Sequence, residues 1–359
     1  MTAQPLPHLL DELLRTGAPS GYEDPAGAVW RRAAAAFAEV SSDGIGSSIA
    51  RVGEAKPLLG VFGHIDEIGL VISHIDEEGF LWAAPIGFWD PQILIGQRVE
   101  IRSRRGPVIG VIGRSKGIGL ILGTDEQNKA VKLEDLHIDI GATTYAEASE
   151  LVRVGDPAVL AVEPVPIAGN RVASRALDNR IGAYIALESL RRCAEAGGPG
   201  GSFAAVATVQ EEMGLLGART AAFELQPDVA IAVDGLYASD SPGLDKRVLG
   251  VRDLGRGPVI GRGAMLSDKV SDFLIETAEA EGITYTVAGY GLGGLALSTQ
   301  TDADAVQATR SGIPTGVVSV PLRYVHSPVE VVDMGDVERA IRLLVAAAAR
   351  LDSGVDFSR

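Results

Sequence analysis

Residues 201–218 read GSFAAVATVQEEMGLLGA and indicate the kind of sheet on which this protein is built. The first half of the stretch is small and apolar, as in a strand that is buried on both faces. The strand ends in two adjacent carboxylates, Glu211 and Glu212. Like charges in a partly desolvated place raise each other's pKa, so the pair needs an explanation. A bound cation, a role in proton transfer and simple exposure to solvent are the three alternatives.

From about residue 170 onward, strand-length apolar runs alternate with helical patterns. Such alternation predicts an α/β fold with a mostly parallel sheet flanked by helices. The predicted helices cover residues 179–196, 212–223, 267–281, 302–311 and 334–351, and the predicted strands cover residues 203–210, 228–234, 284–289 and 315–320. Nearer the N-terminus, Asp24 is a possible cap with Pro25 at the first helical position. A buried strand is expected in PLLGVFG, residues 57–63.

The pattern changes between about residues 71 and 165. Here short apolar runs follow one another closely and are punctuated by Gly and Pro. That spacing predicts a small all-β domain. We therefore expect a discontinuous α/β domain, residues 1–70 plus 166–359, interrupted by an inserted β domain, residues 71–165.

Composition narrows the class of protein. The chain is 46% hydrophobic and 22% charged, which is ordinary for a globular protein. Its net charge of −15 argues against nucleic acid as a partner, because such binding relies on basic surfaces. No apolar run approaches the roughly 20 residues that a membrane helix needs, so no membrane association is expected. The single cysteine, Cys193, lies in a helical pattern and fits a packed thiol in a reducing, cytoplasmic setting.

Polar side chains follow the apolar strands where chain direction brings them to one rim of the sheet, the usual ligand site of open α/β folds. These residues are His64, Asp66, Asp178, Glu211, Glu212, Asp234 and His326. Two imidazoles with several carboxylates form a borderline-hard ligand set, which suits Zn²⁺, Co²⁺ or Mn²⁺. The residue types also suit two ions that share a bridging carboxylate.

Each of these residues also has a purely structural interpretation. Either histidine could be a hydrogen-bonded residue at a strand end, and Asp178 could cap the helix that follows it. Asp234 could belong to an ordinary turn, and the glutamate pair could be acids favoured by a helix dipole. Five unrelated explanations at one rim are jointly improbable, so the sequence favours a metal site.

Long motifs that span nearly the whole chain carry a family resemblance. They are GHIDEIG, ALDNRIG, TVQEEMGLLGARTA, VDG followed by SDSPG, and TDADAVQATRSGIPTGVVSVPLRYVHSPVEVVD. With these motifs in this order, the chain resembles the tetrahedral (TET) aminopeptidases, the glutamyl and deblocking aminopeptidase family of dinuclear metallopeptidases in clan MH. The resemblance implies a phosphorylase/hydrolase-like catalytic domain with an inserted PDZ-like β-barrel. In the family this insert serves dimerisation and the assembly of a hollow tetrahedral dodecamer.

The resemblance also implies an activity and a ligand set. The protein would be a metal-dependent aminopeptidase that acts on peptides with a free N-terminus. Each subunit would bind two divalent ions, most simply Zn²⁺ or Co²⁺. Mn²⁺ is the alternative. His64 and Asp234 would bind one ion. Glu212 and His326 would bind the other, and Asp178 would bridge the two.

Two further roles follow from the same resemblance. Glu211 would be the general base, and Asp66 would orient the imidazole of the first histidine. The chain departs from the family pattern at Asn179, where relatives commonly carry a second aspartate. It departs again just before the TDA motif, where relatives usually carry a glycine pair. Here glycines 293 and 294 lie several residues earlier, and residues 298–300, which precede the motif, are expected to shape the substrate pocket. A preference for one N-terminal residue is therefore not transferred from relatives.

Other functions stay open beside the aminopeptidase. A deacylase of N-acylated amino acids would use the same fold and the same Glu-Glu pair. Some relatives carry an endoglucanase label, but two histidines in a complete ligand set argue against glycosidase chemistry. A catalytically silent metal-binding shell is a third alternative. Retention of Glu211 speaks against it, since a shell needs ligands and no base.

Overall fold

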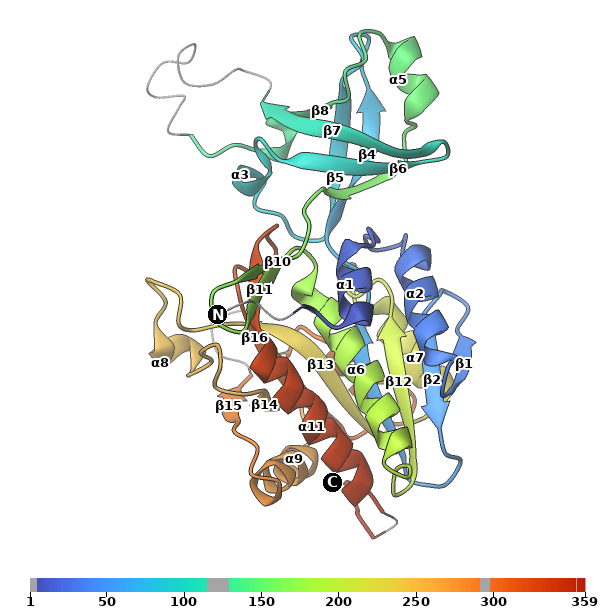
Figure 1. Ribbon diagram of the computed structural model, residues 1–359, viewed down its shortest axis with the longest axis vertical. Coiled ribbons are helices and arrows are strands. Elements are labelled where there is room, and N and C mark those ends of the chain that lie inside the picture. The colour runs from blue at the N-terminus through green and yellow to red at the C-terminus, as the bar shows by residue number, and fades with distance from the viewer. Residues whose placement is uncertain (1–4, 115–128, 291–297, 353, 359) are drawn as a thin grey trace.

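The computed structural model describes residues 5–114, 129–290, 298–352 and 354–358. Figure 1 shows two lobes: a larger one in which helices surround a sheet, and a smaller one formed by a β-barrel. The chain leaves the large sheet, completes the barrel and returns to the large sheet. Within the described residues, no helix combines the length and the apolar character needed to cross a membrane.

The large sheet contains eleven strands within the described part of the chain. At its centre, four strands run parallel in the order β12, β3, β13 and β16. Their bounds are Ser202–Thr208, Leu58–His64, Val229–Tyr237 and Thr315–Arg323. Mainly antiparallel strands extend the sheet: β1 (Glu39–Ser42), β2 (Ser48–Val52), β17 (Glu330–Asp333), β11 (Arg171–Ser174), β10 (Val165–Ile167), β14 (Val259–Arg262) and β15 (Thr286–Gly289). The predicted α/β fold with a parallel central sheet is confirmed.

Helices pack on both faces of the central strands. Along β12, Phe203 and Ala205 belong to one core whereas Ala204 and Val206 belong to the other, as the two-residue period of a strand requires. The first core is covered by α1 (His8–Arg15), α2 (Asp24–Ala34), α6 (Leu177–Glu195), α9 (Asp268–Ala280) and α11 (Met334–Arg350), and the second by α7 (Leu216–Leu225) and α10 (Asp302–Gln307). Cys193 is buried in the first core, as predicted. Because both faces are covered, a ligand reaches the central strands at their ends.

Helix α6 lies directly against strand β3 at two glycines. A Cβ added to Gly63 would lie 2.4 Å from the carbonyl carbon of Gly182 and 2.7 Å from the backbone nitrogen of Ala183. Both atoms belong to the backbone of α6, so they can give way only if the helix shifts. At the start of α6, Asp178 and Asn179 have non-helical backbone angles. The close approach therefore fixes this irregular start of α6 beside the end of β3.

We expect Gly63→Ala to lower the free energy of unfolding by about 1–3 kcal/mol, because the added methyl group forces movement in a packed core. Urea unfolding of the metal-free protein, followed by circular dichroism, measures the change. Gly44→Ala is the matched control, since a Cβ at that position meets no atom within 4 Å. Equal unfolding midpoints for the two variants would show that α6 does not depend on this contact.

The smaller lobe is a closed barrel of six antiparallel strands in the order β4, β5, β8, β7, β6 and β9. Their bounds are Gly69–Ile75, Leu81–Ile86, Leu136–Asp139, Gly106–Arg114, Arg98–Ser103 and Pro157–Leu160. The short elements α3 (Pro91–Leu94), η1 (Leu133–Asp135) and α5 (Tyr145–Leu151) decorate it, whereas α8 (Lys246–Leu249) belongs to the large lobe. The barrel has its own apolar core, which includes Leu70, Val99 and Ile138. The predicted β-barrel is confirmed.

Local structure departs from the sequence predictions in three respects. Helix α7 begins at Leu216 and not at residue 212, because the chain first makes a turn in which the N–H groups of Gly214 and Leu215 donate to the carbonyl oxygen of Glu211. The N-cap of α2 is Glu23, and Asp24 lies in the first helical turn. Strands β14 and β17 were not predicted, since each has only four residues.

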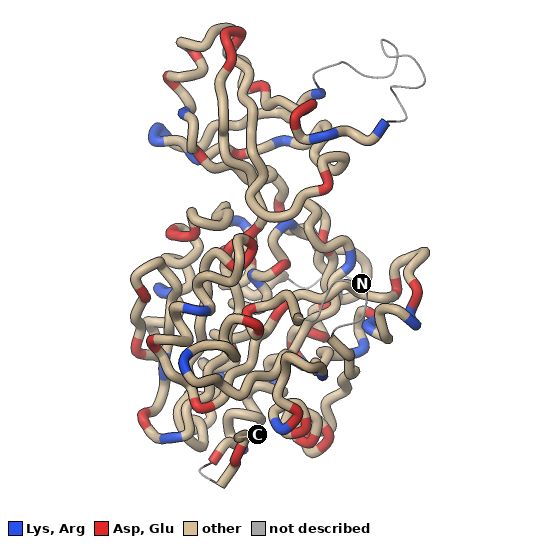
Figure 2. The backbone as a smooth tube through the Cα atoms, turned by 180° about the vertical axis from the view of Figure 1, so that it is seen from behind, with Lys and Arg blue, Asp and Glu red and all other residues tan. Residues whose placement is uncertain are grey.

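Charged residues cover both lobes. Figure 2 shows Lys and Arg interspersed among Asp and Glu in each lobe. Several of these residues form ion pairs, such as Arg192 with Glu338 at 2.7 Å and Arg323 with Asp240 at 2.6 Å. Ion pairs at a protein surface contribute little to stability. Residues of both signs are thus mixed within each lobe.

Candidate metal centre

Separate segments of the chain bring polar side chains to one edge of the large sheet. His64 is the last residue of β3, and in the parallel register it lies beside Thr208, the last residue of β12. Asp234 lies in β13, and His326 follows β16. Because the carboxyl ends of parallel strands meet at one edge, residues far apart in the sequence become neighbours here.

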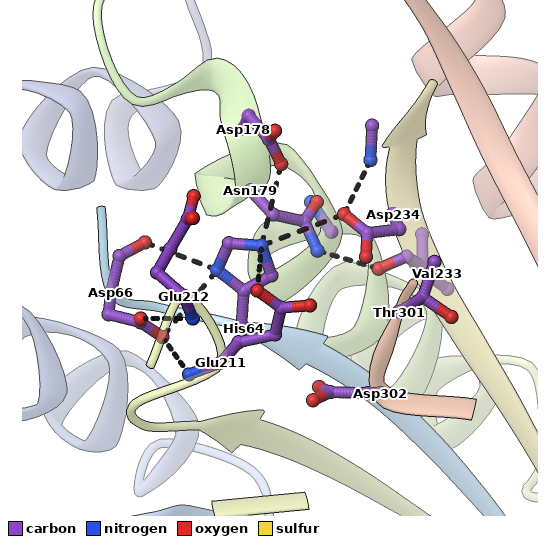
Figure 3. Close-up of polar contacts among 12 residues, drawn as sticks. His64, Asp66, Asp178, Asn179, Glu211, Glu212, Val233, Asp234, Thr301 and Asp302 are labelled. Atoms are coloured by element: carbon purple, nitrogen blue, oxygen red, sulfur yellow. Dashed lines mark hydrogen bonds and ion pairs between the residues drawn. The ribbon is translucent and has the colours of Figure 1, made fainter. Parts of the chain in front are cut away.

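The first group of possible ligands surrounds His64, which is 2% exposed. Its Nε2 atom lies 3.4 Å from Oδ1 of Asp178 and 3.6 Å from Oδ1 of Asp234. Oε2 of Glu211 lies 3.8 Å from the same nitrogen. Figure 3 shows these carboxylates converging on one side of the imidazole ring.

The second group surrounds His326. Its Nε2 atom lies 3.2 Å from Oε1 of Glu212 and 3.7 Å from Oδ2 of Asp178. Asp178 thus directs one oxygen toward His64 and the other toward His326. All the residues that the sequence predicted at this edge are brought together by the fold.

Asp66 lies behind the first group and is fully buried. The Nδ1 atom of His64 lies 3.2 Å from the backbone oxygen of Asp66 and 3.5 Å from its Oδ1. These acceptors favour a proton on Nδ1, which leaves Nε2 free to bind a metal. The Asp66 carboxylate also accepts hydrogen bonds from the backbone N–H groups of Glu211 and Glu212, both at 3.1 Å. The sequence did not predict this second contact, which ties the glutamate pair to the end of β3.

Burial and crowding of charge shift the pKa values at this edge. Burial raises the pKa of Glu211 well above its usual range, and Asp234 adds to the shift against the opposing charge of His64. Burial likewise raises the pKa of Asp234. For His326, burial would lower the pKa, but the contact with Glu212 raises it to about 9. Without a cation the edge therefore holds protons, which a divalent ion would displace.

The donor set fits divalent cations. In three groups of residues, each residue offers one ligand atom, and these atoms all lie within 4.8 Å of one another. The groups are His64 with Asp178 and Asp234, His64 with Glu211 and Glu212, and Asp178 with Glu212 and His326. All donors are imidazole nitrogen or carboxylate oxygen, the types that suit Zn²⁺, Co²⁺ and Mn²⁺. The raised pKa values mark carboxylates whose charge lacks compensation, and a cation supplies it.

The structure adds residues to which the sequence analysis assigned no role. Glu330, in β17, accepts hydrogen bonds from the backbone N–H groups of Asp178 at 3.0 Å and His326 at 2.9 Å. The backbone oxygen of Phe88, which belongs to the barrel lobe, lies 3.1 Å from Nδ1 of His326. Glu330 lies within the motif HSPVEVVD, but nothing in that motif indicated that its side chain accepts hydrogen bonds from two backbone N–H groups of the site.

A second buried acid lies near the edge. Asp302 receives a hydrogen bond from Oγ1 of Thr208 at 2.5 Å, and burial raises its pKa to about 6. Its other oxygen, Oδ1, has no hydrogen-bond partner among the described residues. Asp302 therefore adds negative charge behind Glu211, whose pKa it also helps to raise.

A cavity of about 510 Å³ opens over the edge. It is lined by His64, Phe88, Asp178, Glu211, Glu212, Gly214, Leu215, Asp234, Gly235, Leu236, Tyr237, Ser298, Thr299, Gln300, Thr301, Asp304, Val325 and His326. Residues 298–300 line the cavity as expected, whereas glycines 293 and 294 lie outside the described residues. The cavity is large enough for a small ligand or the end of a peptide.

Arg262 and Lys269 lie away from this cavity. Arg262 pairs with Asp272, and Nζ of Lys269 donates to the backbone oxygen of Ser358. Neither residue lines the cavity, and the described lining residues include no Lys or Arg. The charge of the cavity therefore comes from carboxylates and the two histidines.

Comparison with known proteins gives concordant results. The family model described as M42 glutamyl aminopeptidase matches residues 46–343. A lysyl aminopeptidase from Pyrococcus furiosus is 34% identical over 314 residues, which cover 87% of each chain. Among solved structures, a TET aminopeptidase from a marine sediment Thaumarchaeota archaeon aligns with a TM-score of 0.90 at 35% identity, covering 96% of both chains. The TET1 peptidase of Pyrococcus horikoshii, which can assemble into a tetrahedron or a large octahedral shell, aligns with a TM-score of 0.85 at 33% identity, covering 96% of this chain and 99% of that one.

Proposed function

This chain belongs to the M42 family of aminopeptidases, and from that premise we propose that it removes N-terminal residues from peptides. In this proposal the enzyme uses two bound divalent metal ions, and Glu211 is its general base. The observation that supports a two-ion site most strongly is the orientation of Asp178. Its two carboxylate oxygens face two different imidazoles, those of His64 and His326. A carboxylate that serves two ions must be placed in this way.

The ligand assignment divides the edge into two sites. His64 and Asp234 would hold one ion, Glu212 and His326 the other, and Asp178 both. When bound, such ions act as Lewis acids that polarise the peptide carbonyl and lower the pKa of water. Zn²⁺ and Co²⁺ fit the donor types best, and Mn²⁺ is the alternative.

Glu211 is the group proposed to move protons. It lines the cavity, and burial raises its pKa, which makes its carboxylate a stronger base than an exposed one. Its carboxylate would take a proton from the attacking water and pass it to the nitrogen of the leaving amine. Its neighbour Glu212 lies closest to His326 and would act as a ligand. The two glutamates thus have different tasks because successive side chains point to different partners.

The acidic cavity suits a peptide with a free amino terminus. Its lining carboxylates attract the substrate ammonium group, which is the feature that distinguishes an N-terminus from an internal peptide bond. Asp66 would keep His64 in the tautomer that carries its proton on Nδ1 during the reaction. The barrel is proposed to serve dimerisation and assembly into a larger homo-oligomer, because a related TET peptidase can assemble into a tetrahedron or a large octahedral shell.

The first test is hydrolysis of Leu-, Glu-, Lys- and Ala-p-nitroanilides before and after treatment with a chelator. We expect activity to fall at least about 100-fold on metal removal, since the ions supply several kcal/mol of transition-state stabilisation. Zn²⁺, Co²⁺ or Mn²⁺, added back separately, should restore it. N-acetylated substrates are the matched control and should not be cleaved. Cleavage of the acetyl group instead would identify a deacylase, and inactivity of the folded, metal-loaded protein would identify a silent shell.

A further inference from the structure

The turn that carries the glutamate pair is held by two buried carboxylates. Asp66 accepts the N–H groups of Glu211 and Glu212, and Glu23 accepts the N–H group of Gln210 at 2.9 Å. Three consecutive backbone N–H groups are thus bound by side chains from two other parts of the chain. Figure 3 shows the Asp66 half of this arrangement.

Glu23 occupies an unusual position for a residue at a helix start. It is the N-cap of α2, yet its side chain makes no capping hydrogen bond to that helix. Its Oε1 atom instead accepts from the N–H groups of Gly21 at 2.7 Å and Gln210 at 2.9 Å. Glu23 is only 6% exposed. A carboxyl group at that depth costs free energy unless it is hydrogen-bonded, so these contacts must be part of the fold.

Gln210 is the residue at which the chain turns out of β12. Its φ angle is +54°, in the left-handed region that residues other than glycine seldom adopt. Such a conformation persists only where the surroundings hold it. The backbone oxygen of Gln210 accepts from the N–H group of Leu216 at 3.2 Å, and its N–H group is held by Glu23. The direction of the next two side chains depends on this residue.

We propose that Glu23 is a positioning residue for the catalytic edge: by binding the Gln210 N–H group it fixes the turn that aims Glu211 into the cavity and Glu212 at His326. The inference rests on the proposed function, in which these glutamates are base and ligand. It links the N-terminal segment to the site through the chain Glu23, Gln210 and the glutamate pair. Ser20 reinforces the link, since its Oγ atom donates to Asp66.

The chemistry of Glu23 suggests how to test its role. Burial, together with the charge of Asp66, raises the pKa of Glu23 to about 7. Both hydrogen bonds use one oxygen, Oε1, and an amide oxygen can accept them as well. Glu23→Gln should therefore keep the turn in place. Glu23→Ala removes the acceptor, and Glu23→Asp withdraws it by one methylene group.

We expect Glu23→Ala and Glu23→Asp to weaken metal binding by about 10- to 100-fold, the usual effect of losing a group that supports a ligand. Competition with a chromogenic chelator, with Zn²⁺ as the probe, measures the affinity. Hydrogen exchange in peptides that cover residues 205–215 should become faster in both variants. Glu23→Gln should remain within about threefold of the parent protein. Asp24→Ala is the matched control, because Asp24 lies next to Glu23 in the first turn of the same helix and its side chain is exposed to solvent.

Thermal unfolding of each metal-free variant separates positioning from general damage. Slow exchange and parent-like Zn²⁺ affinity in Glu23→Ala would overturn the inference, as would a Glu23→Gln variant that is impaired like Glu23→Ala. If Glu23→Ala does not fold, Glu23→Asp decides the question in the same way. A parent protein that binds no Zn²⁺, Co²⁺ or Mn²⁺ would instead overturn the proposed function.

Discussion

Replacing Glu211 by Gln should leave a folded protein that binds metal but hydrolyses peptides about 10²- to 10⁴-fold more slowly, because general acid–base catalysis contributes rate factors of that size. The amide keeps the shape of the side chain and cannot accept the proton of water. Glu211 lies farther from His64 than Asp178 or Asp234 does, which fits a residue beside the ligand set. Turnover of an aminoacyl-p-nitroanilide and metal content, measured on the same sample, test this expectation.

The neighbouring glutamate provides the sharpest control. Glu212→Gln should lose metal from the His326 site, because Glu212 is the carboxylate nearest to that imidazole. Glu211→Gln should keep the metal content of the parent protein. If Glu211→Gln lost the metal, or kept full activity, the assignment of the base would be wrong. Two adjacent residues of the same type thereby report on two different functions.

Replacing Asp178 by Ala should have the second large effect, since it removes a ligand from both proposed sites. We expect metal content to fall from two ions to one or none, and activity to fall by about 10²–10⁴-fold, the equivalent of several kcal/mol. Elemental analysis of the purified variant and turnover at saturating Zn²⁺ measure the two quantities. The residual activity should not recover at high metal concentration, because the variant lacks the carboxylate whose two oxygens lie 3.4 Å from Nε2 of His64 and 3.7 Å from Nε2 of His326.

Asp228→Asn is a suitable control for Asp178→Ala. Asp228 precedes β13 at the opposite edge of the sheet and accepts the N–H group of Leu58 at 2.6 Å. Its replacement should leave metal content and turnover unchanged. Full occupancy by two ions in Asp178→Ala would contradict the bridging assignment.

The sequence predicted those features that depend on local pattern. The apolar run in β12 and the alternation of strands with helices were enough to predict a parallel central sheet, whose geometry brings strand ends to one edge. Helix α7 was placed too early, because the acids after β12 resemble a helix start. In fact Gln210 and Leu215 adopt left-handed backbone angles and form a turn first. Short strands such as β17, with four residues, were not predicted because so few residues show no clear two-residue alternation.

The supporting contacts of the site could not be predicted in the same way. Glu23 and Gln210 are 187 residues apart, and Phe88 and His326 are 238 residues apart. Both contacts use a backbone group on one side, which leaves no signature in the side-chain sequence. Glu330 also accepts hydrogen bonds from two backbone N–H groups, and the sequence did not predict these contacts either. Single-sequence patterns therefore indicated the residues that would touch metal and missed those that hold them in place.

The carbonyl group of Phe88 connects the inserted barrel to the proposed metal site. Its oxygen lies 3.1 Å from Nδ1 of His326, and Phe88 itself is 81% exposed and lines the cavity. A barrel that tilted against the sheet would rotate this imidazole, since the acceptor moves with the barrel. We therefore expect that removing the barrel, or exchanging it for that of a relative, would change the orientation of His326, a proposed metal ligand.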